Sequence, residues 1–140
     1  MWFYKGKEYS EIHEESLVGF IYQIIYVGPG ENKGKKYIGK KNFFTTKTIK
    51  KGKKELAAMT DKRGSKKKIL KNESNWKEYK SSNDFLKIQD EKYLKKEILM
   101  FCKTKTDLTY YETKLQFVNE VLESDKWLNG NILSKFFSRI

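Results

Sequence analysis

The segment VGFIYQIIYV, residues 18–27, constrains the fold of this chain more than any other stretch. It is a near-continuous apolar and aromatic run, which is typical of a strand buried on both faces. The turn-rich GPGENKG follows at 28–34, and KKYIGKKNFF then resumes a strand pattern. Strand, turn and strand at this spacing predict a β-hairpin, so the chain must build a sheet and cover both of its faces.

The length of 140 residues suits a single domain over 1–140. The opening WFYKGKEYSEI predicts a small hairpin, so we interpret residues 1–17 as an N-terminal hairpin extension. The segment YLKKEILMFC, residues 93–102, fits a strand or a helix, and its shortness between polar segments favours a strand.

The stretch 107–122 carries the clearest helical pattern, with Thr106 or Asp107 as a candidate N-cap. Its apolar stripe consists of Leu108, Tyr111, Leu115, Val118 and Leu122. Glu112, Gln116 and Asn119 share one polar face of the same helix. A shorter helix is predicted from a cap at Ser81, Ser82 or Asn83 to about residue 91.

The positive charge is concentrated in one third of the chain. Residues 33–80 hold 18 Lys or Arg against four Asp or Glu, whereas the remainder holds 12 basic and 14 acidic residues. Such asymmetry indicates a polyanionic partner, with DNA or RNA first, because a compositional bias toward lysine would spread the charge evenly. Residues 45–75 are too cationic to bury, and we expect a mobile basic loop there.

No apolar run approaches the length of a membrane span, and the first twenty residues lack a signal-peptide pattern. The single cysteine, Cys102, has no partner for an internal disulfide. We therefore expect a protein of the cytoplasm with no membrane partner.

Two short motifs resemble a known family. GFIY at 19–22 is followed by YIG at 37–39, which together resemble the two-part signature of the GIY-YIG nucleases. Glu112 in YYETKLQ matches the family's metal-binding glutamate, and Asn129 or Asn131 in NGNI matches its late asparagine. The resemblance covers about residues 17–132 and is closest to the small stand-alone members of bacteriophages, including those of the homing type.

The resemblance implies an α+β fold, with a small central antiparallel β-sheet of about three strands flanked by helices. It also implies a Mg²⁺-dependent (or Mn²⁺-dependent) DNA endonuclease with Tyr22 as general base, Tyr37 as its positioning partner and Glu112 as the metal ligand. The two tyrosine roles could be exchanged. Mg²⁺ often takes one protein carboxylate plus water and phosphate, and a tyrosine can act as base if nearby cations lower its pKa. Gly39, Gln116, Asn129 and Asn131 are candidate supporting residues.

The chain departs from the family at one position. Most members carry an arginine on the helix after YIG, but the only arginines here are Arg63 and Arg139, and neither has that spacing. We expect Lys40 or Lys41 to supply the charge, with Lys41 placed among the catalytic residues, or Arg63 if the basic loop folds back.

The predicted partner is double-stranded DNA, and the predicted location is the cytoplasm, which is that of the host cell if the protein is phage-encoded. The candidate DNA-binding residues are Lys40, Lys41, Arg63, Lys66, Lys67, Lys68, Trp76 and Tyr79. The two aromatic residues could stack on bases or contact the DNA backbone, and core packing is an equal alternative for Trp76. The alternative is a non-catalytic DNA-binding or accessory protein on a decayed nuclease scaffold. An RNA-binding module is disfavoured because the tandem aromatic signature of RNA-recognition sheets is missing.

Overall fold

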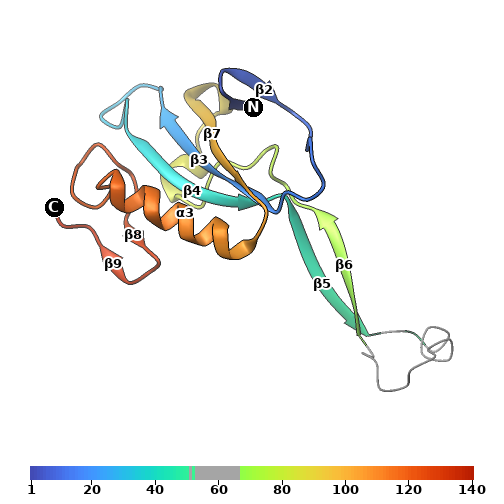
Figure 1. The fold of residues 1–140 in the computed structure, drawn as a ribbon. Coiled ribbons are helices and arrows are strands. Elements are labelled where there is room, and N and C mark those ends of the chain that lie inside the picture. The colour runs from blue at the N-terminus through green and yellow to red at the C-terminus, as the bar shows by residue number, and fades with distance from the viewer. Residues whose placement is uncertain (51, 53–66) are drawn as a thin grey trace.

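A five-stranded sheet forms the centre of the molecule (Figure 1). The computed structural model describes residues 1–50, 52 and 67–140. The strand order is β2-β1-β7-β3-β4. The strands are β1 Trp2–Tyr4, β2 Lys7–Tyr9, β3 Gly19–Tyr26, β4 Lys36–Asn42 and β7 Leu94–Cys102.

The α+β class is confirmed, but the sheet has five strands where the resemblance implied about three. The antiparallel core of the sheet, β7-β3-β4, is the expected part. The N-terminal hairpin adds two more strands because β1 pairs in parallel with β7, which makes the sheet mixed. Burial of the Trp2 ring explains why this short hairpin joins the sheet.

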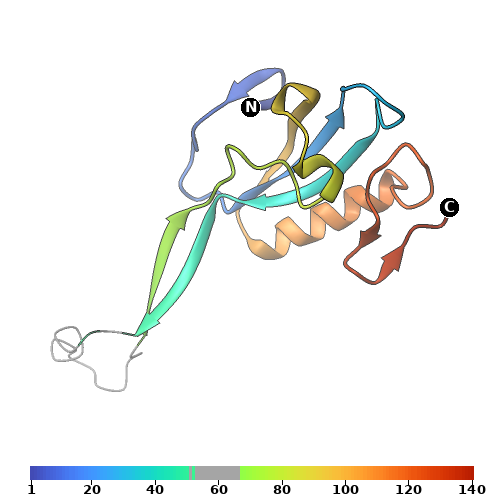
Figure 2. The same ribbon diagram turned by 180° about the vertical axis from the view of Figure 1, so that it is seen from behind.

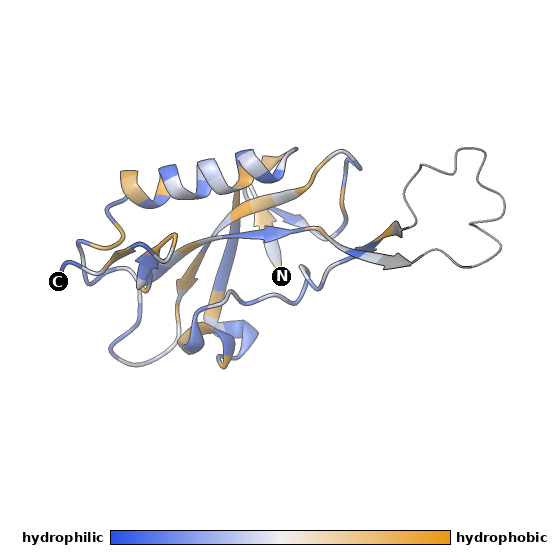
Figure 3. Cartoon of the chain, turned by 90° about the horizontal axis from the view of Figure 1, so that it is seen from below, coloured by the Kyte–Doolittle hydropathy of each residue, from blue (hydrophilic) through white to orange (hydrophobic). Residues whose placement is uncertain are grey.

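Both faces of β3 are covered, as its sequence predicts. Phe20, Tyr22 and Ile24 point into an aromatic cluster, while Ile21 points into a second cluster with Leu108. The second cluster lies under helix α3 (Lys105–Val118). Figures 2 and 3 show α3 on one side of the sheet and the chain between β6 and β7 on the other.

Helix α3 begins and ends earlier than the sequence predicts. Its N-cap is Thr104, whose side chain accepts a hydrogen bond from the Asp107 amide. It ends at Val118 because Glu120 adopts a left-handed conformation with φ of 53°. Val118, which the predicted apolar stripe includes, is exposed, whereas Leu122 is buried beyond the end of the helix.

The remaining elements are short. Helix α2 spans Asp84–Lys87 with Asn83 as its N-cap, and a 3₁₀ turn, η1, covers Glu91–Tyr93, so the helix predicted to about residue 91 is shorter than expected. The strands β8 (Asn131–Ile132) and β9 (Phe136–Phe137) form a small C-terminal hairpin. Within the described residues, no helix is long and apolar enough to span a membrane.

The predicted basic loop is structured at both of its described ends. Strands β5 (Phe44–Lys50) and β6 (Lys67–Glu73) pair in antiparallel register and form a ribbon that extends away from the sheet (Figure 1). Like charge does not prevent this pairing because side chains alternate between two solvent-exposed faces. Residues 51 and 53–66 of the predicted loop lie outside the described residues.

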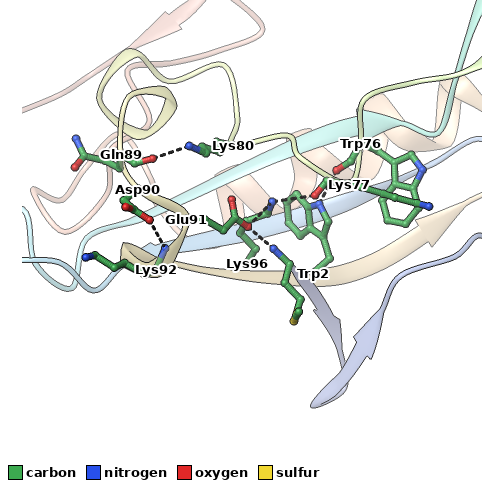
Figure 4. A network of polar contacts seen from close by, with 10 residues as sticks. Trp2, Trp76, Lys77, Lys80, Gln89, Asp90, Glu91, Lys92 and Lys96 are labelled. Atoms are coloured by element: carbon green, nitrogen blue, oxygen red, sulfur yellow. Dashed lines mark hydrogen bonds and ion pairs between the residues drawn. The ribbon is translucent and has the colours of Figure 1, made fainter.

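A buried polar network holds β1 against the sheet (Figure 4). The Lys96 ammonium is fully buried, 3.0 Å from a Glu91 carboxylate oxygen, and 4.5 Å above the Trp2 ring centre. It also donates to the Lys77 carbonyl, while the Trp2 indole donates to the Trp76 carbonyl at 2.7 Å. These contacts compensate for the burial of the Lys96 charge and fix Trp2 beside Tyr22.

Candidate active site

Tyr22 and Gly39 face each other across the central strand pair. They are register partners on β3 and β4, so their side-chain positions share one face of the sheet. A Cβ atom at Gly39 would lie 2.4 Å from the Tyr22 hydroxyl oxygen and 2.6 Å from the adjacent ring carbon. The glycine therefore gives the Tyr22 ring room to lie across β4.

Tyr37 lies beside Tyr22 on the same face. Their ring centroids are 6.3 Å apart, and the two ring planes make an angle of 29° in a stacked arrangement. The Tyr37 hydroxyl is 3.1 Å from the Ser82 hydroxyl, which comes from the chain between β6 and β7. The two signature tyrosines thus come from adjacent strands and meet at one place, the arrangement that the resemblance implies.

A third tyrosine, Tyr79, completes this aromatic group. Its ring packs edge-on to Tyr22 at a centroid distance of 5.9 Å, and its hydroxyl is close enough to Tyr22 to influence its ionisation. The Lys41 ammonium lies 4.2 Å above the Tyr79 ring centre. Sequence reasoning placed Tyr79 among DNA-binding residues and missed this position, as it missed Ser82, because both follow a ribbon that the sequence does not predict.

Glu112 reaches the group from α3. The helix packs on β3 and β4, and the Glu112 carboxylate lies beside the backbone amide of Lys40. Burial raises the pKa of Glu112, while the Lys40 charge and amide act in the opposite direction. The same carboxylate contributes to the raised pKa values of Tyr22 and Tyr37, so all three predicted catalytic groups share one electrostatic environment.

The pKa of Tyr22 lies well above its usual range, opposite to the lowering expected for a base among lysines. Burial is the main cause, followed by Tyr79, Tyr37 and Glu112. Lys41 is not among the groups that shift the Tyr22 pKa, and burial lowers the pKa of its own ammonium. Tyr22 is therefore a neutral phenol in the free protein at neutral pH.

Two buried amides fix the strand that carries Tyr37 and Gly39. Asn129 accepts a hydrogen bond from the Ile38 amide at 3.1 Å and donates to the Ile38 carbonyl at 2.8 Å. Gln116 donates to the same carbonyl at 3.0 Å. Asn131 is exposed, and its side chain accepts from the Ser134 amide, away from β4, so Asn129 is the asparagine that contacts the strand of the site.

The structure places some of the predicted DNA-binding residues in the core, some beside the site and some in the ribbon, and others lie outside the described residues. Trp76 is fully buried, and its indole donates to Glu73. Its core-packing alternative is therefore confirmed, and its placement among the DNA-binding residues is wrong. Lys40 is exposed beside the site and donates to Thr109 at 2.7 Å. Arg63 and Lys66 lie outside the described residues, and Lys67 and Lys68 belong to β6.

The chemistry of the donor set fits a magnesium ion. Among the described residues, no group of three or more His, Cys, Asp or Glu side chains gathers, which disfavours a cage made wholly of protein ligands. Mg²⁺ retains several waters and commonly takes one or two carboxylates together with substrate phosphate. The single half-buried carboxylate of Glu112 matches this requirement.

Paired tyrosines on adjacent strands, a carboxylate on the packed helix and a basic sheet edge define a nuclease-type site. Residues 2–132 match the family described as "Putative endonuclease segE, GIY-YIG domain". The chain therefore belongs to the GIY-YIG nuclease family, and it resembles the small phage-encoded members. Searches of curated proteins and of solved structures return no significant match.

Proposed function

We propose that this protein is a Mg²⁺-dependent DNA endonuclease that hydrolyses phosphodiester bonds. Family membership supports nuclease action on nucleic acid. The observation that carries the finer proposal is the convergence of Tyr22, Tyr37 and Glu112 from three different elements on one electrostatic environment. The basic residues around this point, Lys40 and Lys41, suit a phosphate backbone.

Glu112 holds the metal ion in this proposal. A bound Mg²⁺ supplies Lewis acidity, which stabilises negative charge on the phosphoryl group and on the departing 3′ oxygen. The Lys40 amide on β4 and the Lys40 charge act on this carboxylate and favour its ionised form, the form that binds a metal ion. Mn²⁺ would bind the same oxygen ligand.

Tyr22 accepts the proton of the attacking water, and Tyr37 positions that water. Tyr37 is itself held by Ser82, which suits an orienting role, although the two roles are interchangeable in geometry. Because Tyr22 is a neutral phenol in the free protein, it must first release its own proton to solvent, and it then accepts one from the water as the phenolate. Positive charge added to the site would favour that phenolate. Lys41, stacked on Tyr79, is a cation beside this group and replaces the family's arginine.

The second candidate is a non-catalytic DNA-binding protein on the same scaffold. Two observations favour it: the high pKa of Tyr22 and the substitution of a point-charge lysine for the usual planar arginine. It shares the basic surface with the nuclease proposal but predicts no bond cleavage.

A plasmid-cleavage assay separates the two candidates. Supercoiled DNA is incubated with wild-type protein in Mg²⁺, in Mn²⁺ and in EDTA, and nicked and linear products are measured. We expect cleavage in either metal, none in EDTA, and none with Glu112→Gln. Glu123→Gln, which changes an exposed glutamate just beyond the same helix, is the matched control and should cleave at the wild-type rate.

Cleavage by Glu112→Gln at the wild-type rate would refute the metal assignment. Retention of DNA by wild-type protein without cleavage in any metal would favour the non-catalytic candidate.

A further inference from the structure

Beyond Phe44, which packs against the aromatic cluster, the β5–β6 ribbon extends away from the rest of the described chain (Figure 1). It has seven cross-strand pairs, from Phe44 with Glu73 to Lys50 with Lys67, and it extends from the body in both ribbon views (Figures 1 and 2). Its described side chains from Thr45 to Thr48 and from Ile69 to Glu73 are exposed. An isolated two-stranded hairpin gains little stability of its own, so the ribbon's exposed faces need another explanation.

The root of the ribbon is fixed by buried aromatic residues. Phe43 and Trp76 are both fully buried and pack edge-on at a centroid distance of 5.1 Å. The Ser74 amide donates to the Phe43 carbonyl, and the Ser74 hydroxyl donates to the Asn42 carbonyl at 2.6 Å. These contacts fix the direction in which the ribbon leaves the body, directly after β4.

The two faces of the ribbon differ in their surroundings. Phe44, Thr46 and Lys71 share one face and line a shallow hollow with Leu17, Val18 and Lys105 of the body. The Lys71 ammonium lies 4.1 Å above the Phe44 ring centre on this face. The opposite face carries two cross-strand pairs, Thr45 with Asn72 and Lys47 with Leu70, and we call these four residues the free face.

We propose that the ribbon lies in the major groove of the duplex that the site cleaves, with the free face toward the base edges. The proposal rests on the proposed DNA nuclease function. A major groove about 12 Å wide admits a two-stranded ribbon, whereas a minor groove about 6 Å wide does not. The ribbon strands carry five lysines against one glutamate, which complements the phosphates on either side.

The free face also carries side chains of the types that read bases. Asparagine pairs with the major-groove edge of adenine, lysine with that of guanine, and threonine and leucine offer contacts to the thymine methyl group. The ribbon, and not Trp76, then supplies sequence preference, because Trp76 is buried at the root.

Chain geometry predicts where this preference falls. Seven residues separate Tyr37 from Phe44, and a strand rises about 3.3 Å per residue, so the ribbon begins about 23 Å from Tyr37 and extends for about 20 Å more. At about 3.4 Å per base pair, this distance corresponds to roughly 7–13 base pairs from the cut. Because one ribbon makes this contact, the base preference should fall on one side of the cut only.

Two measurements test the proposal. Wild-type cut sites are sequenced from a random duplex library and aligned, and bound duplexes are separately selected from the same library in EDTA. We expect a base preference about 7–13 base pairs to one side of the cut. Methylation of guanine N7 in that window should weaken binding, because N7 lies in the major groove.

The double variant Thr45→Ala, Asn72→Ala should lose about 5- to 100-fold of the preference at one or two positions while still cutting DNA. The matched control, Thr46→Ala with Thr48→Ala, changes the opposite face of the ribbon and should keep the preference. Loss of the preference with the control but not with the free-face variant would overturn the assignment of faces.

The two proposals fail differently. A wild-type protein that cuts DNA without any preference in the window overturns the ribbon proposal and leaves the nuclease intact. A protein that cuts nothing but selects duplexes in EDTA, with a preference that Thr45→Ala, Asn72→Ala removes, overturns the nuclease and supports the ribbon. Preference for RNA over duplex DNA in the binding selection would overturn the major-groove assignment.

Discussion

Gly39 of the YIG motif matters because of its contact with Tyr22 on the neighbouring strand. The Tyr22 ring lies where any side chain at Gly39 would be, so the ring's position depends on the missing Cβ atom of its strand partner. Tyr37 is two residues away on β4 and stacks beside the same ring. The spacing of the YIG motif is therefore a packing requirement of Tyr22 as well as a sequence signature.

The Tyr22 hydroxyl should contribute strongly to the rate of DNA cleavage. Tyr22→Phe removes one oxygen from a ring whose packing against Trp2 and Tyr79 is otherwise unchanged. We expect a loss of about 10²–10⁴-fold in the cleavage rate, the usual range for a lost acid–base group. Tyr110→Phe, which removes a hydroxyl from an exposed tyrosine of α3, is the control and should leave the rate unchanged.

The pH profile offers an independent check on the same hydroxyl. Because burial raises the pKa of Tyr22, the phenolate fraction grows with pH throughout the neutral and mildly alkaline range. Wild-type kcat/KM should therefore rise between about pH 7 and 9 without a plateau, and the rise should disappear in Tyr22→Phe. An identical profile in the variant would move the base role to another group.

The buried charge of Glu112 should lower the free energy of unfolding at neutral pH. Its folded-state pKa is raised, mainly by burial, so the folded protein binds the proton more tightly than the unfolded chain does. Stability therefore falls as pH rises from the unfolded-state pKa through the folded-state pKa, and above that window the full cost of the charge remains.

We therefore expect Glu112→Gln to unfold at higher temperature than wild type at pH 7, with a difference that disappears in acid below the ordinary glutamate pKa. Thermal unfolding of both proteins across this pH range measures the effect, with Glu123→Gln as control. A Gln variant that is less stable at pH 7 would show that Glu112 makes stabilising contacts that outweigh its burial.

Strand β4 lies at the edge of the central sheet. At Ile38, side-chain amides bond to the backbone groups that another strand would otherwise pair with. The Asn129 amide satisfies both the N–H and the carbonyl of Ile38, and Gln116 adds a second bond to that carbonyl. The Ile38 N–H depends on Asn129 alone among these contacts. This pairing keeps the β4 backbone, and with it Tyr37 and Gly39, in register.

Asn129→Ala should leave the buried Ile38 amide without a partner. We expect a loss of about 1–3 kcal/mol in the free energy of unfolding, measured by urea denaturation. Asn131→Ala removes an exposed asparagine two residues away and should change stability by no more than about 0.5 kcal/mol. Equal effects of the two variants would contradict the assignment of Asn129 as the supporting residue.

Elements with a strong hydrophobic period were predictable from the sequence. The run at 18–27 is a strand covered on both faces, and residues 94–102 are a strand as favoured. The ribbon was not predictable because its stability comes from cross-strand hydrogen bonds and a buried root, and neither produces an apolar period along β5 or β6. The N-terminal hairpin was predicted, but the pairing of β1 with β7 was not, because the single buried anchor of β1 is Trp2.

The candidate site was predictable only in part. Tyr22, Tyr37 and Glu112 carry a recognisable order along the chain, and the structure brings them together. Tyr79 and Ser82 have no such signal, since their place in the site depends on the path of the chain after the ribbon. Trp76 could not be assigned from the sequence, because a tryptophan between charged residues fits the surface and the core alike until its burial is known.

The uneven distribution of charge over the molecule should determine how steeply its affinity for DNA falls with salt concentration. Neutralising the ribbon lysines, Lys47, Lys50, Lys67, Lys68 and Lys71, should weaken binding to all duplexes. It should also flatten the log–log salt slope by about 0.9 for each phosphate that the variant no longer neutralises. A matched variant neutralises five exposed lysines elsewhere in the fold, namely Lys7, Lys87, Lys92, Lys95 and Lys103. Equal slopes for the two variants would mean that net charge alone, and not the ribbon, governs binding.

The buried root at Phe43 and Trp76 divides the chain into two units of different cooperativity. Backbone amides on the body side of the root, including those of Phe43 and Ser74, are bonded to Val18 and Phe43 at the edge of the aromatic core. Within the described residues, the amides of β5 and β6 beyond it pair with the opposite strand of the ribbon, so they should exchange with solvent deuterium through local opening of the ribbon. Proteases would reach the ribbon first for the same reason, and a nick there would leave the core folded.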